Sequence, residues 1–245
     1  MLVTIVLLLS CVYVGSSTSL SRFRFAQHCE IELEQEFSDA EEGSVLWDCS
    51  RVLLAFVAES GEVLGQRILE IGSGTGAVGL SLARMGASSV IMTDKASQLS
   101  LMRRNVERNR PEPLSDIAPV RTELLTWGAK WKADTAYDIV QPSTFDMIVV
   151  CDCVYPSVSP EPLVHVLCEL LDLNPQATIL LACEYRAPTA QVEAGVDHVH
   201  DFFARMRASC SVSRVPDEEI SPQWRCNEIS LWRICVATAA LQDST

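Results

Sequence analysis

The sequence has few basic residues for its length. Its 19 lysines and arginines are outnumbered by 32 aspartates and glutamates among 245 residues, so the formal net charge is -13. Proteins that hold DNA or RNA through the phosphates carry a basic surface, and this deficit argues against a nucleic-acid-binding role. The acidic balance would instead attract a basic partner.

The usual cysteine patterns of a metal or disulfide site are also missing. None of the 10 cysteines belongs to a C-x-x-C pair; Cys151 and Cys153 instead form a C-x-C at the end of an expected strand. We therefore predict no metal site and interpret these two cysteines as small buried hydrophobic residues. The sequence N-x-S/T, the acceptor for glycosylation, is absent too, so no second signal supports a secreted product.

Charged side chains are absent from residues 1–20. Residues 2–14 form an apolar run that is too short to span a bilayer untilted, and small residues follow it, as in a secretory signal peptide without its basic region. An organelle-targeting presequence and a mis-assigned start codon are the alternatives. We expect residues 1–20 to lie outside the fold, residues 21–42 to form an extension or hairpin, and residues 43–240 to form one domain.

The most informative stretch is residues 67–79, which read R-I-L-E-I-G-S-G-T-G-A-V-G. A short apolar strand is followed by glycines at alternate positions and then by a good helix former over residues 77–85. A strand, a glycine-rich turn and a helix bring a nucleotide-sized ligand against bare backbone at a helix N-terminus.

Acidic residues near this turn indicate which ligand it holds. Glu70 lies two places before the first glycine, where a carboxylate would repel a pyrophosphate but suit a positive group. S-adenosylmethionine has a positive sulfur and an ammonium but no phosphate, so we predict this cofactor. Asp94 follows directly after the next expected strand, residues 89–93, where it can accept both ribose hydroxyls. Residues 74–79 also fit G-x-G-x-x-G, so an NAD-dependent oxidoreductase is a distant alternative.

The rest of the chain alternates between apolar strands and helical patterns, which predicts a Rossmann-like, doubly wound α/β sheet. A length of 245 residues with 48% hydrophobic residues suits one such domain. We expect the last strand to close the sheet antiparallel. The expected strands after the first are residues 89–93, 119–125, 145–151, 177–183, 211–215 and 229–237, and the other helices are residues 49–59, 96–109, 160–171 and 197–208.

Three further side chains could belong to the site, and two of them, Trp47 and Asp152, also have a purely structural interpretation. Trp127 follows the third strand, at the ligand crevice, and could face an adenine. Trp47 could cover the cofactor pocket, although a half-buried core tryptophan is favoured on physical grounds alone. Asp152 follows the fourth strand, where it could act in chemistry or serve as a turn or helix N-cap residue before Pro156.

Taken together, these pieces resemble the seven-strand S-adenosylmethionine-dependent methyltransferases. Within them, the chain is similar to the family 16 protein-lysine methyltransferases, which carry a D-x-x-Y motif after the fourth strand. The resemblance covers roughly residues 30–238. The matching pieces are V-L-W-D (45–48), I-L-E-I-G-S-G-T-G-A-V-G-L (68–80), T-D (93–94), T-W-G (126–128), D-C-V-Y (152–155) and I-S-L-W-R-I (229–234).

The resemblance implies a seven-strand sheet and a set of site residues. Asp152 would orient the lysine amine and Tyr155 would line its channel. The implied cofactor-binding residues are Trp47, Glu70, Gly72, Ser73, Gly74, Thr75, Gly76, Asp94, Trp127 and Cys151. The step after the fifth strand reads C-E-Y-R, and no role is carried onto Glu184 or Arg186.

Three functions therefore compete. The leading one is methyl transfer to a lysine side chain of a protein; the others are transfer to another side chain or small molecule, and a silent cofactor-binding scaffold. We expect a protein substrate, no nucleic acid, no membrane for the folded domain, and a monomer. The resemblance implies a cytoplasmic protein, whereas residues 1–20 resemble a signal or organelle-targeting peptide.

Overall fold

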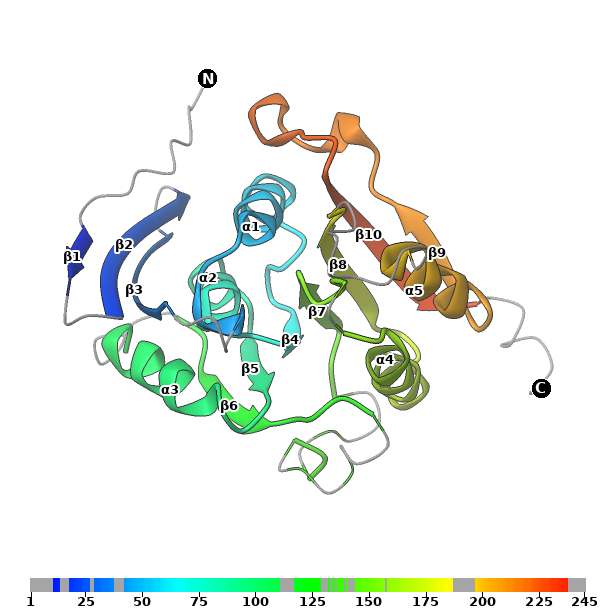
Figure 1. Ribbon diagram of the computed structural model, residues 1–245, viewed down its shortest axis with the longest axis horizontal. Helices are drawn as coiled ribbons and strands as arrows, with labels where there is room; N and C mark the ends of the chain where they lie inside the picture. Colours follow the sequence, from blue (N-terminus) through cyan, green and yellow to red (C-terminus); the bar gives the residue numbers. More distant parts are fainter. Residues whose placement is uncertain are drawn as a thin grey trace.

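The computed structural model describes residues 11–13, 18–26, 29–37, 42–110, 117–128, 132, 134, 136–138, 140, 144–156, 158–186 and 197–237. These residues form two sheets with helices between and beside them (Figure 1). One sheet has three strands in the order β1-β2-β3, and the other has seven in the order β6-β5-β4-β7-β8-β10-β9.

The seven-stranded sheet confirms the expected Rossmann-like, mostly parallel fold. β4 to β8 run parallel, and β10 pairs antiparallel with β8 and β9, between which it lies. The strand order reverses beside β4, at the topological switch point where such sheets bind ligands. The strands are β4 (Arg67–Ile71), β5 (Ser89–Asp94), β6 (Val120–Leu124), β7 (Met147–Cys151), β8 (Thr178–Glu184), β9 (Cys210–Arg214) and β10 (Ile229–Val236).

Helices cover both faces of this sheet, at positions close to those expected. α1 (Asp48–Ser60), α2 (Ala77–Arg84) and α3 (Leu99–Arg108) lie toward the three-stranded sheet, and α4 (Glu161–Leu173) and α5 (His198–Arg207) lie on the other side (Figure 1). α3 starts three residues later than expected because residues 95–98 close a turn, in which the Gln98 amide bonds the Lys95 carbonyl at 3.1 Å. Short 3-10 helices lie at Glu42–Ser44, Asp217–Glu219 and Pro222–Trp224.

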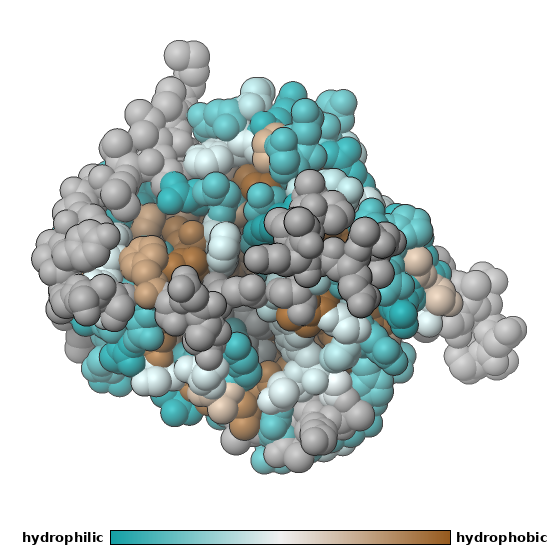
Figure 2. Space-filling view, viewed as in Figure 1, coloured by the Kyte–Doolittle hydropathy of each residue, from teal (hydrophilic) through white to brown (hydrophobic). Residues whose placement is uncertain are grey.

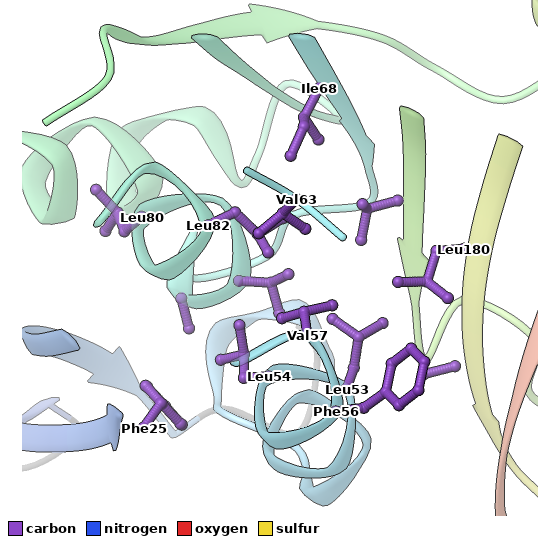
Figure 3. Packing of buried hydrophobic residues seen from close by; sticks show 14 of the residues in the cluster. Phe25, Leu53, Leu54, Phe56, Val57, Val63, Ile68, Leu80, Leu82 and Leu180 are labelled. Carbon is purple, nitrogen blue, oxygen red and sulfur yellow. The ribbon is translucent and has the colours of Figure 1, made fainter. Parts of the chain in front are cut away.

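Alternate residues of β4 face opposite cores. Ile68 belongs to the cluster under α1 and α2, whereas Leu69 and Ile71 belong to the cluster under α4 and α5. In the first cluster, leucines of α1 and α2 fill the space between Phe25 and Leu180 of β8 (Figure 3). Glu70 therefore shares the α2 side of the strand with Ile68, since side chains alternate along a strand.

The three-stranded sheet begins before the expected boundary at residue 20. Its strands are β1 (Cys11–Tyr13), β2 (Thr18–Ala26) and β3 (Cys29–Glu36), and Ser19 of β2 is buried. Residues 11–13 and 18–20 thus belong to the fold, contrary to the expectation. Ser19 and Ser21 are buried and face inward on the same side of β2 as Phe23 and Phe25. Residues 1–10 and 14–17 of the expected leader lie outside the described residues.

The surface is mostly hydrophilic on the face seen in Figure 2, where apolar residues gather in separate patches. Within the described ranges, no helix has the length and apolar character needed to cross a membrane.

Candidate functional site

The glycine turn after β4 is fixed to the end of β5 by hydrogen bonds. The Ser73 amide donates to the Thr93 carbonyl at 2.9 Å, and the Thr93 amide donates to the Ser73 hydroxyl oxygen at 3.1 Å. The Gly74 amide donates to Asp94 Oδ2 at 2.7 Å, and the Lys95 amide donates to Asp94 Oδ1 at 2.7 Å. The structure therefore brings Asp94 and the glycine turn together, as the sequence predicted.

Two glycines of the turn are required by space as well as by backbone conformation. Gly72 and Gly74 have φ values of +70° and +54°. A Cβ on Gly74 would lie 2.5 Å from the Gly43 carbonyl oxygen, and one on Gly72 would lie 2.5 Å from Cys153 Sγ and 3.2 Å from Trp127 Cζ2. Trp127 thus lies beside the bare backbone of Gly72, where an aromatic ring could stack on an adenine.

Glu70 lies beneath the turn and braces it. The residue is 1% exposed, and its Oε2 accepts a hydrogen bond from the Gly79 amide of α2 at 3.0 Å. Burial raises the pKa of Glu70 to about 7, against the opposing effect of hydrogen bonds from Ser73 and Gly79. The carboxylate thus supports the first turn of α2, and its contact with a positive cofactor group stays a prediction.

The remaining predicted residues of the turn are Thr75 and Gly76. We call residues 72–76, together with Glu70, Asp94 and Trp127 around them, the glycine cradle. Gly76 is the N-cap residue of α2, and the carbonyl of buried Thr75 accepts a hydrogen bond from Asn105 Nδ2 at 2.9 Å. Residues 72–76 include no basic side chain. A bare backbone between a carboxylate and an aromatic ring fits an adenosyl group without phosphates better than a dinucleotide.

A second cluster forms where β7 and β8 end. Asp152 follows β7 directly and has φ +56°, the one positive value of a non-glycine residue in the described part of the chain. Its amide donates to the Ala182 carbonyl at 2.8 Å. Residues with such a conformation are uncommon and cluster at functional sites. Ile71 pairs with Val150 across β4 and β7, so this end of β7 lies beside the glycine turn.

Arg186 binds the Asp152 carboxylate with both ends of its guanidinium. Nη1 donates to Oδ1 at 2.9 Å and Nη2 donates to Oδ2 at 2.6 Å, while Nη2 also donates to Glu184 Oε2 at 2.7 Å. The Arg186 guanidinium carbon lies 5.2 Å from the centre of the Trp47 ring. Burial alone would lower the pKa of Arg186, but the bonds and charge of Asp152 outweigh it and raise the pKa.

Cysteines surround this cluster. Cys49 at the start of α1 is buried, and burial, reinforced by Cys151 and Asp152, raises the pKa of its thiol far above the ordinary value. Cys49, Asp152 and Glu184 place possible metal-ligand atoms within 4.8 Å of one another, the one such group found in the described ranges. The Arg186 guanidinium bonds Asp152 and Glu184 and neutralises part of the charge of this group.

The other predicted residues lie near the same strand ends. Cys151 ends β7, and its Sγ lies 3.5 Å from Ser50 Oγ of α1. Tyr155 is half-buried three residues after Asp152. Trp47 is 41% exposed, so it is no core tryptophan. Pro160, and no aspartate, is the N-cap residue of α4, so the N-cap interpretation of Asp152 is wrong.

Arg186 and Glu184 are the site residues that sequence reasoning missed. Glu184 is the last residue of β8 and Arg186 lies two residues beyond it. β8 pairs with β7 so that Cys151 lies opposite Ala182. The adjacency of the two strands was a usable signal, because residues just beyond the carboxyl ends of neighbouring parallel strands meet at one edge. The ion pair itself could not be read from the sequence, since it joins residues 34 positions apart.

Comparison with known proteins agrees with this geometry. Among the solved structures that share the fold is the 16S rRNA N2 G1207 methyltransferase RsmC of T. Thermophilus. Its TM-score is 0.56, with 16% identity, and the match covers 92% of this chain and 52% of that chain. Another is the ribosomal protein L11 methylase of Lactobacillus delbrueckii subsp. bulgaricus, with a TM-score of 0.51 and 14% identity over 88% of this chain and 98% of that chain. These two likenesses show the fold of the chain.

The sequence gives the narrower assignment. Residues 26–208 match the lysine methyltransferase family. The chain is 34% identical to the protein N-lysine methyltransferase METTL21A of Mus musculus over 68% of this chain and 72% of the relative. It is 29% identical to EEF1A lysine methyltransferase 3 of Xenopus tropicalis over 72% and 71%. The chain belongs to the lysine methyltransferase family, as the D-x-x-Y motif predicted.

Proposed function

We propose that this protein transfers a methyl group from S-adenosylmethionine to a lysine side-chain amine of a protein, and that Asp152 orients this amine. The observation that carries the proposal is the position of Asp152, held at positive φ at the end of β7 beside the glycine turn. Strained backbone of this kind clusters at functional sites, and this end of β7 borders the crevice where the cofactor would lie.

Within the proposed mechanism, each residue has a separate task. Asp94 would hold the ribose, the glycine turn would receive the methionine part and Trp127 would pack on the adenine. S-adenosylmethionine supplies the methyl group on a positively charged sulfur. Asp152 accepts a hydrogen bond from the amine and aligns it, because alignment at about 3–3.5 Å provides most of the acceleration in a displacement reaction.

The substrate amine must lose a proton before transfer. A lysine has a reference pKa of about 10.4, so freeing its amine at neutral pH costs roughly 4 kcal/mol. A desolvated channel and the nearby positive sulfur of the cofactor lower the pKa of the amine, against the opposing effect of the Asp152 carboxylate. We assign the lining of this channel to Tyr155, which is half-buried beside the cluster.

The class of substrate rests on the relatives and on charge. METTL21A is named a protein N-lysine methyltransferase, and a net charge of -13 suits a basic protein segment better than a nucleic acid. We propose that the folded domain acts as a monomer away from the membrane surface. The compartment stays a prediction, cytoplasmic by family resemblance, and fusion of residues 1–25 to a fluorescent protein would test it.

Replacement of Asp152 by asparagine tests the proposal. Asparagine tolerates positive φ and keeps the shape of the side chain, so the backbone should persist while the charge is lost. We expect Asp152→Asn to reduce transfer of labelled methyl to lysine by at least about a hundredfold, as loss of an aligning group does. Calorimetry should show cofactor affinity within a few-fold of the unmodified protein.

The matched control is Asp146→Asn. Asp146 forms a similar bidentate pair with Arg67, with distances of 2.9 and 2.7 Å, just before the other end of β7. This variant should keep full transfer. Label on a residue other than lysine would favour a different acceptor, and cofactor binding without any transfer would favour the scaffold. Full activity of Asp152→Asn would refute the role assigned to this carboxylate.

A further inference from the structure

We infer that Arg186 occupies the position that the substrate's lysine ammonium takes on Asp152 and Glu184, so that substrate binding is an exchange of one cation for another. This inference rests on the proposed function. It assigns two further residues to the reaction: Glu184 as part of the cation-binding site, and Arg186 as an internal competitor that selects for a charged side chain.

The first argument is that Arg186 blocks access to Asp152. Both carboxylate oxygens of Asp152 accept from the guanidinium, and the Asp152 side chain is only 4% exposed. A substrate amine that hydrogen-bonds this carboxylate must therefore reach a group that solvent hardly contacts. Arg186 is the side chain that covers it with the opposite charge.

The second argument is that Arg186 can leave without repacking the core. Its side chain is 26% exposed, and its other two partners, Glu184 and Trp47, are 29% and 41% exposed. Arg186 lies two residues beyond the end of β8, outside the sheet. Movement of this side chain therefore breaks contacts that face solvent, apart from those to Asp152.

The third argument concerns what must replace Arg186. Its departure would leave two carboxylates close together, one of them almost fully buried. An unpaired buried charge is costly, so a second cation is favoured strongly over a neutral group. A lysine ammonium carries one positive charge and three donors on a slender stem, which matches two carboxylates at the mouth of a narrow site.

The exchange is tested with Arg186→Met, which keeps an unbranched apolar stem and removes the charge. The probe is n-butylammonium, a mimic of the lysine side chain, titrated into the full chain in the presence of S-adenosylhomocysteine and followed by calorimetry and by the NMR signal of the Trp47 indole. We expect Arg186→Met to bind n-butylammonium at least about ten-fold more tightly than the unmodified protein does, because in the unmodified protein Arg186 occupies the site in most molecules. Guanidinium ion should compete with the probe in this variant.

Three controls make the result specific. Arg67→Met removes the matching cation from Asp146, whose carboxylate is 37% exposed, and should leave n-butylammonium binding unchanged. The neutral probe n-butanol should not gain affinity. Arg186→Lys keeps the charge but loses the forked guanidinium, so its affinity for n-butylammonium should lie between those of the unmodified protein and Arg186→Met. A cooperative thermal transition checks that each variant is folded.

Two outcomes overturn the inference. Affinity for n-butylammonium in Arg186→Met that equals or falls below that of the unmodified protein would show that Arg186 does not compete for the site. Rescue of lost methyl transfer in Arg186→Met by added guanidinium would show that Arg186 is needed in place during the reaction. The proposed function fails separately, if the unmodified protein moves no label to lysine, because the binding titration does not depend on transfer.

Discussion

At the scale of single residues, Asp152 combines two unfavourable features that its neighbours offset. A non-glycine residue at positive φ costs on the order of 1–2 kcal/mol, and a nearly buried carboxylate must find a partner. Arg186 supplies the partner through two hydrogen bonds, and the Ala182 carbonyl holds the backbone. The fold therefore maintains a conformation that Asp152 would not adopt unaided.

Glu70 makes the stability of the protein depend on pH in an unusual direction. The folded pKa is raised from 4.5 to about 7, so the protonated side chain favours folding and stability falls as pH rises through this range. Glu70→Gln cannot ionise but can still accept from Gly79. We expect the variant to gain roughly 3 kcal/mol over the unmodified protein at pH 8 and little at pH 4.5, measured by urea unfolding. A difference that does not change with pH would contradict this.

Gly74 should tolerate no side chain. A β-branched residue would force a Cβ to within 2.5 Å of the Gly43 carbonyl and would adopt φ +54° against its preference. We expect Gly74→Val to abolish measurable binding of S-adenosylmethionine in calorimetry. Gly61→Ala is the control, since φ there is +69° but nothing lies within 4 Å; it should lose about 1 kcal/mol of stability and keep the cofactor. Intact binding by Gly74→Val would argue against the cradle.

At the scale of elements, side-chain amides from α3 and from its C-cap residue hydrogen-bond the backbone of β3. Asn105 accepts from the Glu34 amide at 2.7 Å and donates to the Glu34 carbonyl at 2.9 Å. Asn109 makes the same pair of bonds with Glu32, at 2.9 and 2.6 Å. Asn105 also bonds the Thr75 carbonyl of the glycine turn. Two side-chain amides thereby satisfy backbone groups of β3 and connect the three-stranded sheet to the candidate cofactor site.

The two asparagines should differ in their effect on the cofactor. Asn105→Ala leaves part-buried backbone groups of β3 and a buried carbonyl of the glycine turn without this partner. We therefore expect a loss of about 2–4 kcal/mol in stability and several-fold weaker cofactor binding. Asn109→Ala should lower stability and leave the affinity for the cofactor unchanged. Thermal unfolding and calorimetry on both variants check this, and equal cofactor affinities would disprove the connection through Thr75.

The positions of the elements could largely be predicted, because the main strands and helices differ clearly in their apolar spacing. The failures have local causes. β7 begins at Met147, two residues later than expected. The Phe145 amide donates to the Asn174 side chain, and the Asp146 carboxylate accepts from the Arg67 guanidinium. The start of β2 was not predicted, because Ser19 and Ser21 are small polar residues on a buried face and give no hydrophobic signal.

At the scale of the whole molecule, charge should govern how fast substrate arrives. The net charge of -13 attracts a basic segment over a long range, and salt screens this attraction with a Debye length of about 8 Å at 0.15 M. We expect kcat/KM for a lysine-rich protein acceptor to fall several-fold between 50 and 500 mM NaCl, while kcat changes little. Assays across this range check it, and a rate that rises with salt would exclude steering.

The candidate site was predictable only in part, because it is assembled from segments far apart in the chain. Residues of the glycine turn and Asp94 follow from a pattern within 25 positions, and they lie together as predicted. Trp47 precedes α1 and Arg186 follows β8, and the two meet through packing of α1 near β8. No spacing rule in the sequence reports such a meeting.

The place of β10 has a consequence for synthesis on the ribosome. This strand is made last among the seven, yet it is inserted between β8 and β9, and its Leu231 and Ile234 are fully buried. While residues 229–236 are still inside the exit tunnel, β8 has an open edge and β9 has no neighbour to join. The sheet can therefore close only after residues 229–236 have left the tunnel, and until then β8 keeps an unpaired edge of the kind that can pair with another chain.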